Sequence, residues 1–433
     1  MAISSRKLKI IFSIIIAALI ATSIFLKEEK EFIKVSEITN GLGIKTSAVS
    51  VKNEDVIYIK CIFENAGVLH NSLEKHGISA VVGHLLFNKI DKLSPEETQD
   101  KMKALGIGNL FVDSMEDNFE ISFYIIKDKA KEALQFLSNA FAKPTFTDGD
   151  LENAKEMFPN VLDIELSSPS ALMLDKMLSM LFENSTYGMN NTGTSQSVSS
   201  ITSNEIHSFI KERLTKKNLT VVFAGDISRF DACSYLDDLF KNISAEHQNF
   251  EAQKIGSASS KDKVFTINKL GMKDIAGIMA GVRIDELTDV ERAAAYIIME
   301  TIFNEKTGDF LLGLKSKGIA YNINNFSIKR SLSNIFYFSA FIEKNDVEKY
   351  QKYIDEKISQ YNSKINLKEL QKTQNYFIEK SKNGFADLSD IDEKIYNSSL
   401  PYDDVTPKIF EKVIKMIFNK ENIKVIVCYE KTE

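Results

Sequence analysis

From residue 38 to the end of the chain, short apolar or alternating stretches are interleaved with longer segments whose apolar residues recur every three or four positions. The first pattern is typical of strands and the second of amphipathic helices. In the first half of the chain, the pattern predicts strands at residues 45–51, 56–63, 109–112, 119–125 and 219–224. Between these strands it predicts helices at residues 79–90, 95–105, 129–142, 148–165, 171–182 and 203–214.

A similar order of strands and helices returns after a polar stretch at residues 246–262, which we interpret as a linker. The second half has predicted strands at 264–270, 275–282, 321–328, 335–342 and 423–428, and predicted helices at 290–304, 309–317, 347–362 and 367–380. Strands followed by helices, twice over, predict an α+β fold of two homologous domains that arose by duplication, each a mixed sheet packed with helices. We place these domains at residues 31–245 and 263–433.

The first 30 residues have the layout of a signal peptide or a membrane anchor. Arg6, Lys7 and Lys9 precede an uncharged run at residues 10–26, and a charged stretch follows at 27–30. Export signals and single anchors need such a basic flank, apolar stretch and charged stop. We therefore expect an exported protein, either periplasmic or anchored to the inner membrane and facing the periplasm. Whether the segment is cleaved stays open.

Charge and composition exclude several classes of function. The 433-residue chain carries 54 Lys and Arg against 60 Asp and Glu, and its net charge of −6 argues against nucleic-acid binding. The three cysteines, Cys61, Cys233 and Cys428, lie far apart, so they form neither a zinc ribbon nor a disulfide framework. Only five histidines are present, which restricts any metal site built from imidazoles.

The segment at residues 77–87 reads Gly-Ile-Ser-Ala-Val-Val-Gly-His-Leu-Leu-Phe. It resembles the metal-site helix of the pitrilysin/insulinase family of zinc metallopeptidases. The motif of that family is H-x-x-E-H, in which the two histidines hold zinc and the Glu activates the metal-bound water. The resemblance continues along the chain, in the family's order, at residues 40–42, 66–67, 105–119, 167–170, 187–193, 224–226 and 314–321.

The resemblance does not carry the zinc site with it. The first metal His falls on Ala80 and the base Glu on Gly83, and only the second metal His is matched, by His84. The third ligand of the family, a Glu, falls near Val161. The acids nearest to that position are Glu156 and Glu165. Because a catalytic zinc needs three protein ligands and a water, the resemblance implies a pseudoenzyme, inactive alone, with no catalytic residue and no cofactor, and with His84 as a remnant.

Two-domain members of this family work in pairs, in which one subunit carries the zinc motif and a partner without it grips the peptide. In the non-catalytic partner, an Arg and a Tyr six residues apart are implicated in substrate positioning. Here the Arg position holds Lys315, and the Tyr is matched by Tyr321. A Lys keeps the positive charge but lacks the planar, bidentate contact of a guanidinium. The resemblance therefore implies a zinc-less subunit of a heterodimeric peptidase, which binds peptide or unfolded protein through Lys315 and Tyr321 and pairs with a zinc-bearing pitrilysin-like subunit.

Two other functions stay open on the sequence. The chain is an active zinc endopeptidase if a displaced metal site combines His84 with other acids, in which case zinc is its own cofactor. Alternatively, it is a non-proteolytic scaffold that uses the peptidase fold to assemble other proteins. Zinc content tests the first alternative, and the effect of Lys315 and Tyr321 substitutions on a partner's proteolysis tests the second.

Overall fold

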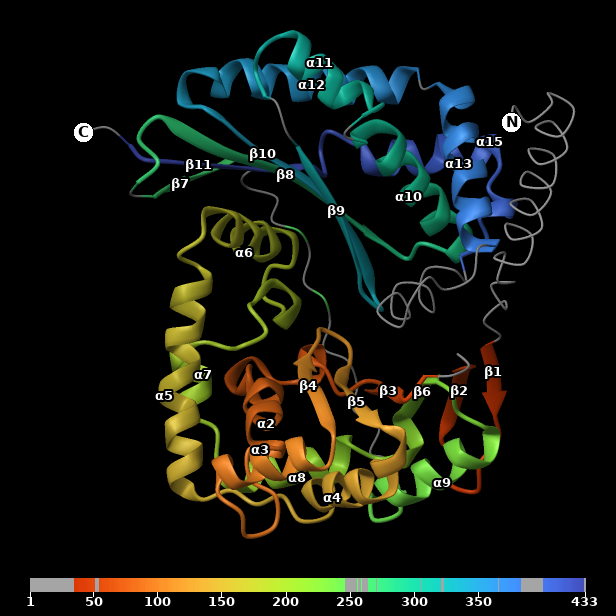
Figure 1. The fold of residues 1–433 in the computed structure, drawn as a ribbon. Helices are drawn as coiled ribbons and strands as arrows, with labels where there is room; N and C mark the ends of the chain where they lie inside the picture. The colour runs from red at the N-terminus through yellow and green to blue at the C-terminus, as the bar shows by residue number, and fades with distance from the viewer. Residues whose placement is uncertain are drawn as a thin grey trace, which may run out of the picture.

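The computed structural model describes residues 35–50, 54–245, 255, 258, 264–269, 271–304, 306–320, 323–364, 366–382 and 400–431. The export segment expected at residues 1–30, the candidate residue Tyr321 and nearly all of the expected linker lie outside them. The described residues fold into two α+β halves, each built on one sheet (Figure 1). Within these ranges, no helix combines the length and the apolar character that crossing a membrane requires.

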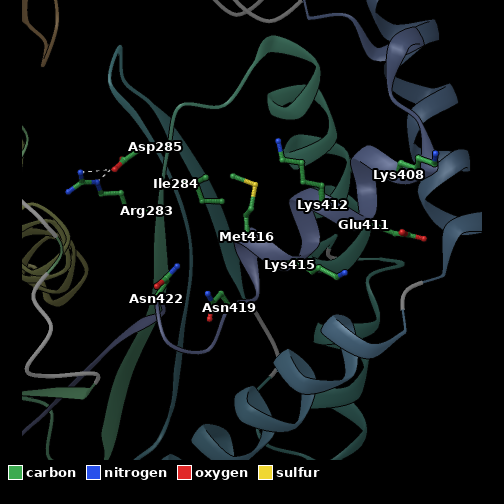
Figure 2. A pocket seen from close by; sticks show the side chains of 10 residues that line it. All are labelled: Arg283, Ile284, Asp285, Lys408, Glu411, Lys412, Lys415, Met416, Asn419 and Asn422. Carbon is green, nitrogen blue, oxygen red and sulfur yellow. Dashed lines mark hydrogen bonds and ion pairs between the residues drawn. The ribbon is translucent and has the colours of Figure 1, made fainter.

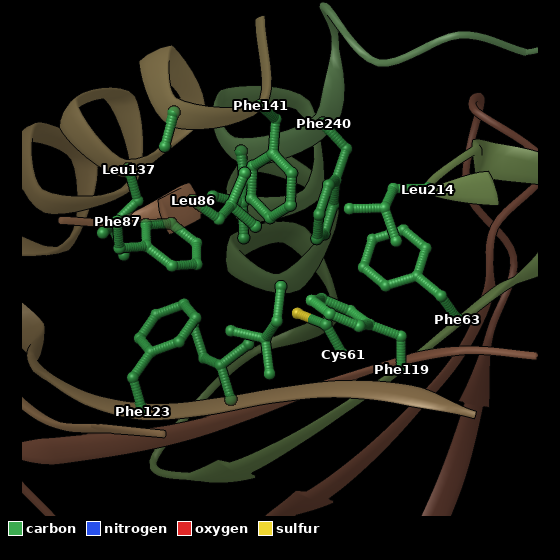
Figure 3. Close-up of a cluster of buried hydrophobic side chains, with 14 of the residues drawn as sticks. Cys61, Phe63, Leu86, Phe87, Phe119, Phe123, Leu137, Phe141, Leu214 and Phe240 are labelled. Atoms are coloured by element: carbon green, nitrogen blue, oxygen red, sulfur yellow. The ribbon is translucent and has the colours of Figure 1, made fainter. Parts of the chain in front are cut away.

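The N-terminal half is built on a six-stranded sheet with the strand order β1-β2-β6-β3-β5-β4. The strands, in chain order, are β1 (Val35–Ile38), β2 (Lys45–Ser50), β3 (Val56–Phe63), β4 (Ile107–Ser114), β5 (Phe119–Ile126) and β6 (Leu219–Gly225). One face of this sheet is covered by helices α2 (Ile78–Leu86), α3 (Pro95–Ala104), α4 (Ala130–Ala142), α8 (Ser203–Arg213) and α9 (Arg229–Phe240) (Figure 1). Between sheet and helices, Phe141 packs against both Phe63 and Phe240 at the centre of the core (Figure 3).

The C-terminal half repeats this arrangement with a five-stranded sheet of order β7-β11-β8-β10-β9. Its strands are β7 (Val264–Asn268), β8 (Ile275–Asp285), β9 (Asn324–Lys329), β10 (Ser333–Glu343) and β11 (Lys424–Tyr429). Helices α10 (Asp289–Phe303), α11 (Asp309–Ser316), α12 (Val347–Ser363), α13 (Leu367–Lys382) and α15 (Pro407–Ile417) cover one face (Figure 1). In each half the last strand pairs in parallel with a strand from the beginning of the same half: β6 pairs with β2, and β11 pairs with β7. The shared topology confirms the predicted α+β fold with two homologous halves.

The structure contains every strand and helix that the apolar pattern predicts, with ends that differ by a few residues. The pattern missed strand β1 and the short helix at Ser195–Ser199, and it also missed two longer helices, α9 and α15. Each begins with a recognisable start signal: a reciprocal capping box joins Ser228 and Asp231 before α9, and Pro407 occupies the first turn of α15. These local signals identify both helices when they are read together with the apolar spacing.

Helices α5 (Asp148–Glu165) and α6 (Pro169–Leu181) connect the two halves, and the short helix α7 (Ser195–Ser199) lies beside α5 (Figure 1). Although α6 lies within the N-terminal half in sequence, between β5 and β6, it packs on β8 and β11 of the C-terminal sheet, where Met173 and Met177 are fully buried. Glycine on β8 permits this contact, because a Cβ atom at Gly277 would lie 2.8 Å from Met173 Cε. The two sheets are therefore joined by a buried apolar contact as well as by the chain itself.

Candidate functional site

Helix α2 carries the remnant of the expected metal motif on its less buried side. The helix starts after Gly77, whose φ of 93° is in the left-handed region that favours glycine. Its apolar residues, from Ile78 to Leu86, are buried in the N-terminal core. Ala80 and Gly83 are half-buried, and His84 is exposed. The helical period thus brings the three motif positions to one side of α2, as the sequence predicts.

The His84 side chain packs against an aromatic ring. The imidazole meets the ring of Phe158 on α5 edge-on, with the ring centres 6.0 Å apart. Partial burial lowers the pKa of His84 from its ordinary value. The residue that α5 brings to His84 is therefore a phenylalanine, which has no atom that binds a metal.

Neither of the two acids on α5 that the sequence singled out lies at this contact. Glu156 is two residues before Phe158, which places it about 200° around the helix, on the opposite side. Glu165 is seven residues after Phe158, on the same side but about 10 Å further along the axis. Its carboxylate accepts a hydrogen bond from Asn190 Nδ2 at 3.3 Å.

A side chain at position 83, where the family motif has its Glu base, would press against the apolar residue Val112. A Cβ atom at Gly83 would lie 3.1 Å from Cγ1 of Val112 on β4 and 3.7 Å from the ring of Phe119. A methyl group at Ala80, no side chain at Gly83 and one imidazole at His84 do not fit a catalytic zinc, which needs three protein ligands. In the part of the chain that the structure describes, no three His, Cys, Asp or Glu side chains lie close enough together to hold a metal ion.

Strand β4, next to α2, is an open edge of the N-terminal sheet. Among the strands that the structure describes it pairs only with β5, and a register shift between Gly108 and Phe111 forms a bulge in its first half. After the bulge, exposed and half-buried residues alternate: Phe111 is 59% exposed, and Val112 turns toward α2. An exposed edge strand offers unpaired backbone groups to which an extended peptide can add. The sequence reasoning found the strand but not this role, because strand order is not visible in local pattern.

The two predicted substrate-binding residues have different outcomes. Lys315 is exposed in the last turn of α11, on the helix-covered side of the C-terminal sheet and away from α2 (Figure 1). The helix ends at Ser316, and it is followed by Gly318, whose φ is 65°. The Gly318 and Ile319 amides donate hydrogen bonds to the carbonyls of Lys315 and Leu314, respectively. Tyr321 lies outside the described residues, so its position relative to Lys315 stays a prediction.

Two open grooves lie on the C-terminal half, away from α2 and β4. One, of about 710 Å³, runs between β8 and α15 and is lined by Lys408, Lys412 and Lys415 (Figure 2). Its charge is partly neutralised, because Arg283 forms a bidentate pair with Asp285 and Lys412 pairs with Glu291 of α10. The other groove, of about 830 Å³, lies between the ends of α10, α12 and α13. Neither groove contains a residue of the motif helix.

Sequence comparisons find a family model and curated relatives that match parts of this chain. A family model described as "Peptidase M16 inactive domain" matches residues 200–377. The chain is similar to an uncharacterized zinc protease of Rickettsia felis, with 22% identity over 347 residues, which are 79% of this chain and 81% of that protein. It is also similar to the mitochondrial-processing peptidase subunit beta of Dictyostelium discoideum, with 19% identity over 48% of this chain and 44% of that protein.

A solved structure gives the same picture for the fold. The peptidase M16 inactive domain from Pseudomonas fluorescens superposes with a TM-score of 0.80 at 16% identity, covering 92% of this chain and 98% of that one. The two halves, their sheets and the helix layers are therefore a shared architecture.

Proposed function

This chain belongs to the pitrilysin/insulinase family of zinc metallopeptidases, family M16, and we propose that it acts there as a zinc-less, non-catalytic subunit that binds extended peptide and pairs with a zinc-bearing subunit. One observation carries the proposal: the motif side of α2 has lost its metal chemistry, while the edge strand β4 beside it is open.

The loss of zinc chemistry is supported by three independent features of the site. Ala80 and Gly83 supply no ligand and no base, and the ring that packs beside His84, Phe158, has no atom that binds a metal. A single imidazole does not hold a catalytic zinc, since such sites use three protein ligands. A Glu at position 83 would also have to displace Val112 by a few tenths of an ångström.

Peptide binding is supported by the edge of the N-terminal sheet. An extended peptide that adds to β4 after the bulge gains backbone hydrogen bonds, and Phe111 offers an exposed apolar contact for its side chains. Because Val112 of the same strand contacts α2, such a peptide passes along the degenerate motif. The net charge of −6 favours cationic peptides over acidic ones.

Pairing is supported by the relatives. The Dictyostelium protein is named as a subunit of a processing peptidase, and a chain without its own zinc contributes to proteolysis only beside one that has zinc. The apolar run at residues 10–26 after three basic residues supports export, with the pair in the periplasm or anchored to the inner membrane.

Zinc content and proteolysis of the pair test the proposal. The full chain is expressed alone and together with a homologue from the same organism that carries an intact H-x-x-E-H, and zinc is measured by elemental analysis. We expect no zinc in this chain alone, about one zinc per pair and cleavage of a fluorogenic cationic peptide mainly by the pair. Stoichiometric zinc in this chain alone, lost in the His84→Ala variant, would return it to the active enzymes. A stable pair whose cleavage rate equals that of the homologue alone would favour the scaffold function.

We retain Lys315 and Tyr321 as proposed substrate-positioning residues of the pair. Lys317, two residues after Lys315, is a matched control because its ammonium group already pairs with Glu356 at 3.7 Å. Lys315→Ala is expected to slow cleavage by the pair without changing its assembly, whereas Lys317→Ala leaves the cleavage rate unchanged. Equal effects of the two variants would remove Lys315 from the site.

A further inference from the structure

The tips of two hairpins, one from each half, meet next to the edge strand β4. The first tip joins β4 to β5 at residues 115–118, and the second joins β9 to β10 at residues 330–332. Asp117, on the first tip, accepts hydrogen bonds from the backbone amide of Ser331 at 2.7 Å and from its hydroxyl at 2.6 Å. The hydroxyl of Tyr187 also donates to Asp117. One carboxylate thus receives three donors, two from Ser331 of the C-terminal half and one from Tyr187.

Arg330 adds a buried charge to this contact. The residue is 2% exposed, and its guanidinium donates to Glu116 Oε1 at 2.8 Å and to the Tyr187 carbonyl at 2.6 Å. The guanidinium also lies over the rings of Phe182 and Tyr187, with centroid distances of 4.9 and 4.7 Å. Charge-assisted hydrogen bonds of this kind are among the stronger ones in proteins, particularly where water is excluded.

The N-terminal half holds the same tip from the other side. The amides of Gly67, Val68 and Leu69 donate to the carbonyls of Asp117, Met115 and Glu116 at 2.9 to 3.0 Å. Position 67 has room only for glycine, because a Cβ atom there would overlap the Asp117 carbonyl carbon. At the end of β4, Asn191 Nδ2 donates to the Ser114 carbonyl at 3.0 Å. The tip is therefore clamped between the two halves.

We propose that Arg330 and Ser331 are positioning residues for β4: the C-terminal half fixes the peptide-binding edge of the N-terminal half in its extended conformation. Phe111 to Ser114 run directly into the clamped tip, so their backbone directions depend on where the tip is held. If the edge strand is already ordered, peptide binding does not have to order its backbone, and the entropy cost of binding is smaller. The inference rests on the proposed peptide binding at β4.

Two measurements on the same variants test the inference. Binding of a fluorescein-labelled, unstructured, lysine-rich peptide to the full chain is followed by fluorescence anisotropy, and hydrogen exchange is measured separately for residues 107–118 and for β3 and β6. Ser331→Ala removes the hydroxyl from an exposed position and keeps the backbone amide donor, so the fold is retained. We expect its Kd to rise about fivefold and exchange to quicken in residues 107–118 only.

Arg330→Lys keeps the positive charge but lacks the planar guanidinium, so it is expected to weaken binding at least as much as Ser331→Ala. Arg229→Lys, on the exposed start of α9, is the matched control and leaves both readouts unchanged. Phe111→Asp, which alters the edge itself, is expected to abolish binding without changing the exchange of β3 and β6.

The outcomes separate the two ideas. If the wild type binds the peptide and Phe111→Asp removes binding, but Ser331→Ala changes neither the Kd nor the exchange of residues 107–118, the clamp is overturned and the proposed function stands. If the wild type does not bind the peptide, the proposed peptide binding falls and the inference falls with it. Faster exchange throughout β3 and β6 in Ser331→Ala would also overturn the inference, because it would show general destabilisation.

Discussion

Replacing Gly313 by alanine is predicted to destabilise the protein, although the same change inside a helix normally stabilises it. Gly313 lies within α11, where alanine improves helix propensity by about 1 kcal/mol. A Cβ atom at this position, however, would overlap the Tyr353 hydroxyl and lie 3.1 Å from Cζ of the same ring. Tyr353 is buried, and its hydroxyl donates to the Phe310 carbonyl at 2.8 Å.

The magnitude follows from these contacts. Overpacking a well-filled core costs about 1 to 3 kcal/mol, and the loss of the hydrogen bond from Tyr353 to Phe310 costs about 1 kcal/mol more. After the gain in propensity is subtracted, the net loss is about 2 kcal/mol, or about 4 to 8 °C in Tm for a half of this size. Urea unfolding and thermal melting, both followed by circular dichroism, measure the change.

Gly149→Ala is the matched control, because Gly149 also lies in a helix but its Cβ would meet only Thr147 Oγ1, at 3.6 Å. This control should be neutral or stabilised by up to about 1 kcal/mol. In the Tyr353→Phe background, the cost of Gly313→Ala should fall by about 2 kcal/mol or more, since both the overlapping hydroxyl and its hydrogen bond are gone. The reasoning is refuted if Gly313→Ala stabilises the protein as Gly149→Ala does.

Three further predictions concern the N-terminal half. Burial lowers the pKa of His76 from 6.5, so the unfolded chain binds the proton more readily and the folded protein loses stability as the pH falls below that value. His76→Gln should therefore flatten the decrease in urea midpoint between about pH 7.5 and about pH 5.5, and an unchanged slope would contradict this. Gly67→Ala should cost about 3 kcal/mol or more in urea unfolding because of the overlap at the hairpin tip, and a loss below about 1 kcal/mol would show that the tip adapts. Ala80→His combined with Gly83→Glu restores H-x-x-E-H but should not give stoichiometric zinc in elemental analysis, because the third ligand is still missing; full zinc occupancy would show that another ligand is within reach.

Local signals in the sequence account for most of the secondary structure. The apolar spacing predicts the strands and helices, because it records which side of each element is buried. Start signals such as the reciprocal capping box of Ser94 and Glu97 fix helix ends. The loss of the metal chemistry is also a property of the sequence, since Ala80 and Gly83 have no side-chain donor in any conformation.

The candidate site needed more than these signals. The pattern predicts both β4, which lies at an edge, and β5, which is paired on both sides, but it does not give their order in the sheet. Phe111 looks like a core residue in the sequence and is 59% exposed in the structure. Likewise, the period of α5 does not reveal that the α5 residue in contact with His84 is Phe158 and neither Glu156 nor Glu165.

The sequence by itself determined the elements, their repetition in two halves and the degenerate motif, since each of these depends on residues close together in the chain. Only the tertiary structure decided that α6 covers the sheet of the other half, that β4 is left open, and that Arg330 and Ser331 meet Glu116 and Asp117. Periodicity records that a face is buried, but not which surface buries it. Contacts between residues more than 200 positions apart depend on how whole sheets and helices pack, and that information is spread over the entire chain.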